Sequence, residues 1–189
     1  FVEIKTFHAF CFDLLGRIGN LDDAKDVVSR AAQMISEGEV EPNRIAKTVL
    51  VIDEAQDMSS EEYALVRALM NANEEMRVIA VGDDDQAIYG FRGADIGNVF
   101  RFCKDFPHSK LLRLEWNYRS VPKVLYLANN IFEDKPLLLR KTLRAGNSSK
   151  KPIFLENRAP EFWVSEDPQT ELLRIVSKIK ELREAYDLE

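Results

Sequence analysis

Two apolar runs that each end in carboxylates constrain the fold most strongly. The first, Thr48–Ile52, leads into Asp53 and Glu54, and the second, Val78–Val81, leads through Gly82 into a run of aspartates. Short continuous apolar runs bounded by turn residues are typical of buried strands. Helical patterns alternate with these runs, which predicts a largely parallel α/β sheet. Both acidic clusters should therefore lie outside the carboxyl ends of strands, where ligands bind in such sheets.

The remaining periodicities complete the predicted element order and suggest a domain boundary close to Asn117. We expect strands over 1–7, 110–120 and 152–156, and helices over 8–18, 21–37, 61–72, 121–132 and 169–185. Ser59 is the expected N-cap of the helix over 61–72, and Glu61 and Glu62 lie in its first turn, where the helix dipole favours them. The predicted domains are 1–116 and 117–189.

Composition excludes several classes of protein. With 189 residues, 46% of them apolar, the chain is long enough for one good core or two small ones. It contains neither an apolar run of membrane-spanning length nor an opening signal-peptide pattern, so we expect a cytoplasmic protein. Cys11 and Cys103 lie in apolar contexts without a CxxC motif, which indicates core thiols. The net charge of −6 argues against a wholly basic nucleic-acid coat but permits a local cationic groove.

The acids at the strand ends suit phosphoryl transfer. One carboxylate, Asp53, can hold a hydrated Mg²⁺, and its neighbour Glu54 can accept a proton from an attacking water. A lone Asp-Glu pair after a strand would more often only cap the next helix. Here a second strand also ends in carboxylates, and two such clusters side by side are costly without a cation. The sequence therefore favours a cation site.

The loop after the second strand adds a different chemistry. Gln86 cannot ionise, and its amide suits hydrogen bonding to a terminal phosphate or a water. Tyr89 and Phe91 can stack on bases and Arg92 can pair with phosphate, although core packing of the two rings is the alternative. The flanking glycines Gly90 and Gly93 favour an exposed loop over a packed helix.

These residues also carry a family resemblance. The stretches "VLVIDEAQD", "VGDDDQAIYGFRGAD" and "LEWNYRS" resemble the second, third and fourth motifs of UvrD/Rep-like superfamily 1 DNA helicases, in the family's order. "TFHAF" resembles the short DNA-contacting motif that precedes them in that family. The resemblance implies a partial, parallel-sheet RecA-like motor domain over 1–116, followed by the start of a second RecA-like domain over 117–189.

The resemblance also implies a role for each matching residue. Asp53 would hold Mg²⁺, Glu54 would activate the attacking water and Gln86 would sense the γ-phosphate of ATP. From the second domain, Arg119 would reach that phosphate as an arginine finger, while Tyr118 would stack on the adenine. The residues that would face single-stranded DNA are Thr6, His8, Tyr89, Phe91 and Arg92.

The implied activity is an ATP-dependent helicase that moves on single-stranded DNA, or on DNA with a single-stranded tail, most often 3′ to 5′. Phe91 stands where many members have Trp, Trp116 stands where Gln is usual, and the segment between "TFHAF" and "DEAQD" is short for the family. The sequence contains no GxxxxGK[ST] phosphate loop. We therefore expect the chain to be the central part of a longer protein and not to hydrolyse ATP by itself.

Two other functions fit parts of the pattern. A two-metal nuclease would use the same acids and would cleave DNA with Mg²⁺ but without ATP. A DNA-binding module with a degenerate ATPase would keep the fold and lose turnover. The nuclease gives Gln86 and the "NYRS" stretch no role, and the missing phosphate loop favours the DNA-binding module only if the parent sequence also lacks that loop. The helicase is therefore the leading hypothesis.

Overall fold

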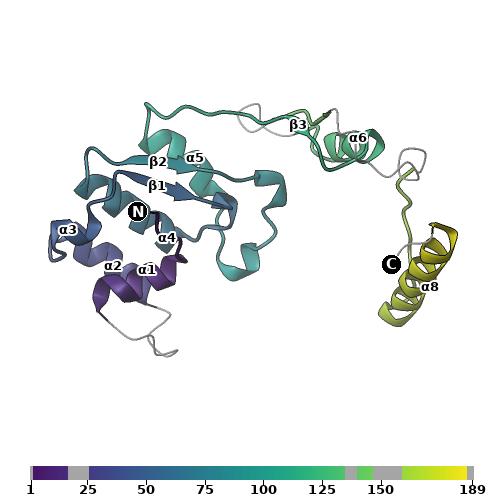
Figure 1. The fold of residues 1–189 in the computed structure, drawn as a ribbon, viewed down its shortest axis with the longest axis horizontal. Helices are drawn as coiled ribbons and strands as arrows, with labels where there is room; N and C mark the ends of the chain where they lie inside the picture. Colours follow the sequence, from purple (N-terminus) through teal and green to yellow (C-terminus); the bar gives the residue numbers. More distant parts are fainter. Residues whose placement is uncertain (1, 17–25, 135–139, 147–158, 187–189) are drawn as a thin grey trace. The chain divides into compact units, whose positions relative to one another are not determined.

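The computed structural model describes residues 2–16, 26–134, 140–146 and 159–186 (Figure 1). It divides into two compact units, Phe1–Lys110 and Leu111–Glu189. The first unit holds a parallel pair of strands with its helices, and the second holds a smaller parallel pair with two helices. The fold is therefore mixed α/β with small parallel sheets, in agreement with the predicted class.

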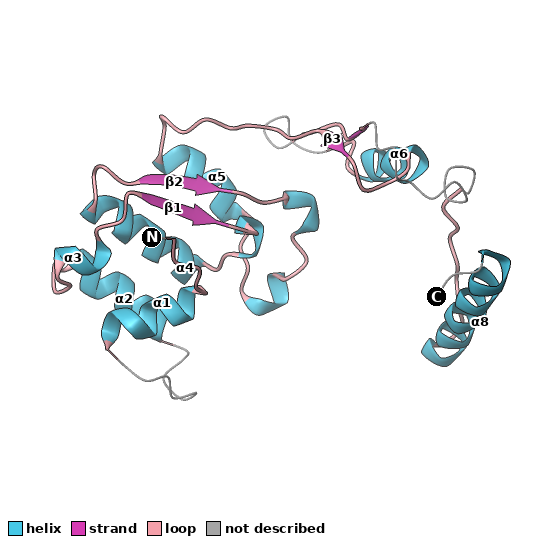
Figure 2. Ribbon diagram, viewed as in Figure 1, coloured by secondary structure: helices cyan, strands magenta, loops and turns pink. Residues whose placement is uncertain are grey.

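The sheet of the first unit pairs β1 (Val49–Ile52) with β2 (Arg77–Ala80) in parallel, with Ile52 opposite Ala80. The helices of this unit are α1 (Phe7–Leu15), α2 (Val27–Ser36), α3 (Pro42–Ile45), α4 (Ser60–Ala72) and α5 (Gly97–Asp105). Figure 2 shows the two strands side by side and pointing the same way. The expected strand–helix–strand order around β1, α4 and β2 is confirmed.

Helix α4 separates two hydrophobic clusters. On one side it packs against α1 and α2, around the fully buried Cys11, Ala31 and Leu65. On the other side Val66 and Tyr63 pack against Ile52 at the end of β1. The helix begins with a complete capping box, in which the Ser59 hydroxyl accepts from the Glu62 N–H and the Glu62 carboxylate accepts from the Ser59 N–H. The predicted N-cap at Ser59 is thus confirmed.

The strands of the first unit are buried on one face only. Ile52 is buried beneath α4, whereas Val51 is 61% exposed and Ile79 is 51% exposed. The prediction of fully buried strands is therefore wrong. A continuous apolar run suits a strand that is covered on both faces, and the described residues of this chain cover one.

The predicted strand over 1–7 is also wrong. Residues 2–6 form no strand, and Val2 and Ile4 are 90% and 94% exposed. An alternating pattern needs a neighbouring strand before it can pair, and Thr6 instead serves as the N-cap of α1 through a 3.1 Å bond from the Ala9 N–H. Helix α5 and the short α3 were not predicted.

The second unit contains β3 (Trp116–Asn117) and β4 (Arg144–Ala145), paired in parallel, with α6 (Pro122–Ile131) and α8 (Pro168–Tyr186). Both helices confirm their predictions, whereas the strand expected over 110–120 shortens to β3. The strand expected over 152–156 lies outside the described residues, as do residues 21–25 of the helix expected over 21–37. Among the helices that the structure describes, none is long and apolar enough to cross a membrane.

Candidate active site at the strand ends

Backbone pairing brings the two acidic clusters of the first unit together. The ladder between β1 and β2 continues past the strands, because the Val81 N–H donates to Ile52 O at 2.8 Å and the Ala55 N–H donates to Val81 O at 2.9 Å. The segment with Asp53 and Glu54 therefore runs beside the segment that leads into Asp83. This is the arrangement expected when neighbouring parallel strands both end in carboxylates.

Glu54 adopts an unusual backbone conformation. Its φ of 50° and ψ of 45° lie in the left-handed region, and it is the one non-glycine residue with positive φ in the part of the chain that the structure describes. Such a conformation costs about 1–3 kcal/mol and persists where surrounding contacts enforce it. Here the Glu54 N–H donates to the Asp53 carboxylate at 3.0 Å, and the Asp57 N–H donates to Glu54 O at 2.9 Å. Strain of this kind is common at functional sites.

A buried amide joins the two clusters. Gln56 is 3% exposed; its Nε2 donates to Glu54 Oε2 at 2.8 Å, and its Oε1 accepts from the Asp83 N–H at 3.0 Å. Gly82 leaves room for this side chain, since a Cβ at Gly82 would lie 2.5 Å from Gln56 Oε1. Glutamine is rarely so buried unless its amide is fully paired. The Gln56 amide thus joins the Glu54 carboxylate after β1 to the Asp83 backbone after β2.

The three aspartates after β2 begin a short 3₁₀ turn, Asp84–Gln86. The Asp83 carboxylate accepts from the Asp85 N–H at 3.0 Å and from Gln86 Nε2 at 2.8 Å. Potential ligand oxygens of Asp83, Asp84 and Asp85 lie within 4.8 Å of one another, and they form the one such trio among the described residues. Carboxylate oxygens are the donors that Mg²⁺ prefers, so this edge of the sheet suits a hard cation. Asp53 is not part of the trio, and its role as the metal ligand stays a prediction.

The loop beyond Gln86 presents an aromatic surface. The ring centroids of Tyr89 and Phe91 lie 6.0 Å apart, and the Arg92 guanidinium lies 5.1 Å from the first ring and 5.5 Å from the second. Phe91 is 80% exposed, which excludes core packing for this ring. Gly93 ends the turn at a φ of 90°, a backbone conformation that residues other than glycine rarely adopt. The expectation of an exposed loop is confirmed.

A second buried amide holds the far end of this loop. Asn98, 1% exposed, donates through Nδ2 to Met58 O at 2.9 Å and to Ser59 O at 3.2 Å. The Asp95 N–H also donates to Met58 O, at 3.2 Å. The loop from Asp83 to Asp95 is therefore fastened at both ends to the segment that follows Glu54.

Two other predicted DNA contacts lie at the start of α1. The Thr6 hydroxyl caps this helix, and His8 is an exposed side chain in its first turn. Their contact with DNA stays a prediction.

The two predicted nucleotide-binding residues of the second unit follow β3. Asn117 Oδ1 accepts from the N–H groups of Arg119, at 3.0 Å, and Ser120, at 2.7 Å, which fixes a tight turn. Tyr118 is 63% exposed, and its ring packs so closely over Gly146 that a Cβ at Gly146 would overlap the ring. The side chain of Arg119 lies at the surface of its unit. Their roles at a nucleotide stay predictions.

The strand-end acids, the buried amide and the aromatic loop all fall within a segment that matches a known family. Residues 16–107 match the UvrD/REP helicase N-terminal domain. DNA helicase II of Escherichia coli (strain K12) is 43% identical over 108 residues, which cover 57% of this chain and 15% of that protein. The chain belongs to the UvrD/Rep-like helicase family.

Other relatives in the UvrD/Rep-like family extend the match. ATP-dependent DNA helicase Rep of Buchnera aphidicola subsp. Schizaphis graminum is 34% identical over 145 residues, covering 76% of this chain and 21% of the relative. ATP-dependent DNA helicase srs2 of Schizosaccharomyces pombe is 38% identical over 137 residues, covering 70% of this chain and 15% of the relative. The chain thus spans only 15–21% of the length of these three relatives.

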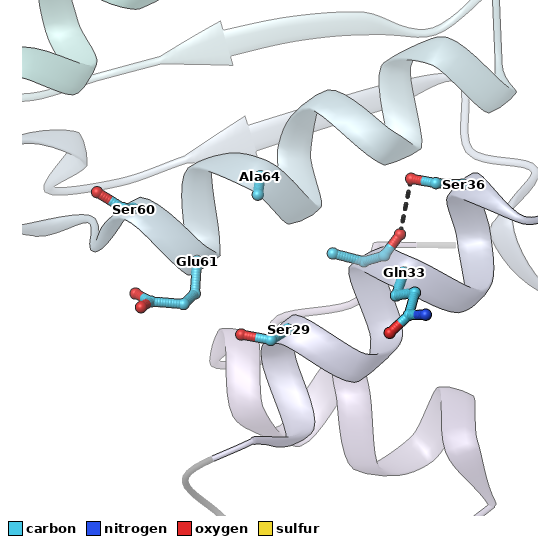
Figure 3. A pocket seen from close by; sticks show the side chains of 7 residues that line it. Ser29, Gln33, Ser36, Ser60, Glu61 and Ala64 are labelled. Carbon is cyan, nitrogen blue, oxygen red and sulfur yellow. Dashed lines mark hydrogen bonds between the residues drawn. The ribbon is translucent and has the colours of Figure 1, made fainter.

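A surface pocket of the UvrD/Rep-like chain lies away from the strand ends. It has a volume of about 410 Å³ and lies between α2 and α4 (Figure 3). The residues that line it are Ser29, Ala32, Gln33, Ser36, Ser60, Glu61 and Ala64. None of the predicted site residues is among them, and the Ser36 hydroxyl is already bonded to Ala32 O at 2.9 Å. The pocket therefore adds nothing to the candidate active site.

Sequence reasoning missed the two buried amides. Gln56 lies inside the "DEAQD" stretch, and Asn98 lies in a segment for which no helix was predicted. A glutamine flanked by Ala55 and placed two residues after Glu54 gives a weak local signal of an inward-facing amide. Gln56 pairs with the nearby Glu54 and also with the distant Asp83 N–H. Asn98 pairs with backbone oxygens about 40 residues earlier in the chain. Sequence spacing could not identify these distant partners.

Proposed function

We propose that this chain is the central part of the motor of an ATP-dependent DNA helicase that moves on single-stranded DNA. The observation that supports the proposal best is the continuity of one short segment. Gln86, the candidate phosphate sensor, is hydrogen-bonded to Asp83 beside the Glu54 turn, and an exposed aromatic surface begins at Tyr89. A change at a bound phosphate would reach a DNA-facing loop within a few residues.

On the nucleotide side, each group has a distinct task. Mg²⁺ would neutralise charge on the phosphates, held by Asp53 with help from the neighbouring aspartates. The Glu54 carboxylate would accept a proton from the attacking water. Gln86 would donate a hydrogen bond to the terminal phosphate, or would donate to or accept from that water. Arg119 would stabilise the developing negative charge, and Tyr118 would stack on the adenine. ATP is a proposed ligand because relatives are named ATP-dependent helicases.

On the DNA side, the aromatic loop suits binding without sequence preference. Stacking of a base on an aromatic ring contributes about 1–3 kcal/mol and tolerates every base. Phe91 offers an exposed ring, and Arg92 adds a cation that pairs with phosphate. Thr6 and His8 would contact the DNA backbone. The proposed substrate is single-stranded DNA or DNA with a single-stranded tail, with movement 3′ to 5′.

The proposed architecture follows the family. Residues 1–116 would be the C-terminal part of a first RecA-like motor domain, and 117–189 the start of a second. Mixed α/β structure with parallel strand pairs in both units is consistent with this assignment. We propose a cytoplasmic location, because the proposed substrate is DNA.

The direct test replaces the proposed general base in the complete protein that contains this chain. Glu54→Gln keeps the size of the side chain and removes its capacity to accept a proton, so we expect ATP turnover to fall by about 100-fold or more while ATP still binds. Steady-state hydrolysis and nucleotide-binding titrations measure the two effects.

The matched control is Glu75→Gln, since Glu75 is an exposed carboxylate in the turn before β2. This control should hydrolyse ATP at the wild-type rate. DNA-stimulated turnover that survives in Glu54→Gln would contradict the proposed role of Glu54.

A further inference from the structure

We propose that Gln56 is a positioning residue that orients the Glu54 carboxylate and couples it to Gln86. This inference rests on the proposed function and deepens it, because it adds a residue between the proton acceptor and the phosphate sensor. Gln56 would touch neither ATP nor the attacking water. Its effect would act through the two groups that it joins.

The orientation of the Gln56 amide follows from its partners. The Glu54 carboxylate can only accept a hydrogen bond, so the atom that faces it at 2.8 Å must be the NH₂ group. The Asp83 backbone N–H can only donate, so the atom that faces it at 3.0 Å must be the carbonyl oxygen. A flipped amide would lose both bonds. One buried side chain therefore fixes the separation between the Glu54 turn and the start of the aspartate run.

Glu54 depends on this contact for its orientation. Its side chain is exposed, and a free glutamate in water samples several rotamers. Within the described part of the chain, Gln56 supplies the hydrogen bond that reaches its carboxylate. The left-handed backbone at Glu54 sets the direction in which the side chain leaves the turn, and the Gln56 amide then holds its end.

The path continues from Gln56 to the phosphate sensor. Asp83 accepts from Gln86 Nε2 at 2.8 Å, so four side chains and one backbone N–H form a continuous series: Glu54, Gln56, Asp83 and Gln86. Hydrogen bonds are directional, so a displacement of one group changes the geometry of the next bond in the series. The Gln56 amide at the centre of the series is buried, whereas the bond between Gln86 and Asp83 is exposed. A shift of Gln86 toward a phosphate would therefore be felt at the Glu54 carboxylate.

Close packing at Gly82 supports a precise role over simple filling. A Cβ at this position would lie 2.5 Å from Gln56 Oε1 and 3.1 Å from the Ala55 nitrogen. The amide thus lies directly against the backbone of the neighbouring strand end. A one-ångström displacement of a catalytic group can lower a rate by about 100-fold. The close packing that restricts the Gln56 amide would therefore affect the rate of hydrolysis.

The test uses Gln56→Met in the complete protein. Methionine nearly matches glutamine in size and keeps the buried volume, but it removes both hydrogen bonds. We expect kcat for DNA-stimulated ATP hydrolysis to fall by about 10–100-fold, as for other residues that orient catalytic groups, while the Kd for ATP stays unchanged. Gly82→Ala is the second variant. This variant keeps the glutamine at position 56, but the added Cβ would displace the Gln56 amide oxygen. We therefore expect it to lower kcat as Gln56→Met does.

The matched control is Asn73→Leu at the other end of α4. The Asn73 amide also makes two hydrogen bonds, to Ile45 O and Leu69 O, both at 3.0 Å. Its loss should lower the Tm of the protein without lowering kcat. If Gln56→Met and Gly82→Ala both hydrolyse ATP at the wild-type rate, the positioning role is overturned. It is also overturned if kcat, ATP affinity and Tm decline together.

Coupling to Gln86 is tested by a double-mutant cycle. If the path through Asp83 is real, Gln86→Met should lower kcat less in the Gln56→Met background than in the wild type, because the link is already broken. Fully additive effects would contradict the coupling. A wild-type protein without DNA-stimulated ATP hydrolysis would overturn both the proposed function and this inference. An active wild type whose variants are equally active would overturn only the positioning role of Gln56.

Discussion

Single residues differ in reactivity because their surroundings differ. Cys11 is fully buried, and burial raises the pKa of its thiol to about 12, with a smaller contribution from the charge of Glu62. The thiolate is the reactive form, so a raised pKa leaves little of it near neutral pH. Cys103 is partly exposed on α5. The expectation of a core thiol is confirmed for Cys11 and is wrong for Cys103, which is only partly buried.

This difference gives a prediction for thiol modification. In the folded chain at pH 8, Cys103 should react with an alkylating reagent well before Cys11, because the Cys11 thiol stays protonated and enclosed. Mass spectrometry of time points locates the label, and unfolding in urea should equalise the two rates. Equal rates in the folded chain would show that the packing of α1 with α2 and α4 does not enclose Cys11.

At the same scale, the sequence predicted which acidic residues lie side by side better than it predicted the hydrogen bonds between them. Asp53 and Glu54 could be placed beside the aspartate run because parallel strands end at a common edge. The bond between Gln56 and the Asp83 N–H could not be predicted, because it depends on how closely Gly82 approaches across the strand ends. Local patterns report burial and turn formation, whereas such contacts arise from packing between distant segments.

Among the elements, the loop between β2 and α5 has the clearest functional prediction. Phe91→Ala should weaken single-stranded DNA binding by the complete protein by about 1–3 kcal/mol, since an exposed stacking ring is removed. Ile88→Ala is the control, because Ile88 is a 70% exposed side chain of the same loop without a π face. Fluorescence anisotropy with labelled oligonucleotides measures both affinities. Equal losses in the two variants would argue against stacking on Phe91.

The elements that could be predicted are those with strong local signals. Helix α4 has its own capping box and apolar residues at helical spacing, and α8 has a long apolar stripe. The strand expected over 1–7 had the right alternation but no neighbour to pair with. Helix α5 was missed because it begins just after a glycine-containing turn and is held by Asn98, whose partners Met58 and Ser59 lie about 40 residues earlier in the chain.

For the whole molecule, the described residues of the two units differ in how well their apolar side chains are buried. The first has two hydrophobic clusters on either side of α4. In the second, the apolar face of α8 is largely exposed, with Leu173 64% and Ile179 52% accessible. Composition correctly indicated enough apolar residues for a core, but it could not show that, among the described residues, the apolar face of α8 would stay largely exposed.

The proposed function requires this chain, within the complete protein, to couple ATP hydrolysis to single-stranded DNA. The first measurement is the steady-state rate of ATP hydrolysis by the complete protein with Mg²⁺, with and without single-stranded DNA. In parallel samples that contain Mg²⁺ but no ATP, the integrity of the DNA is followed. The proposed function predicts strong stimulation by DNA, and DNA that stays intact. A hydrolysis rate that ignores DNA, or Mg²⁺-dependent DNA cleavage without ATP, would contradict it.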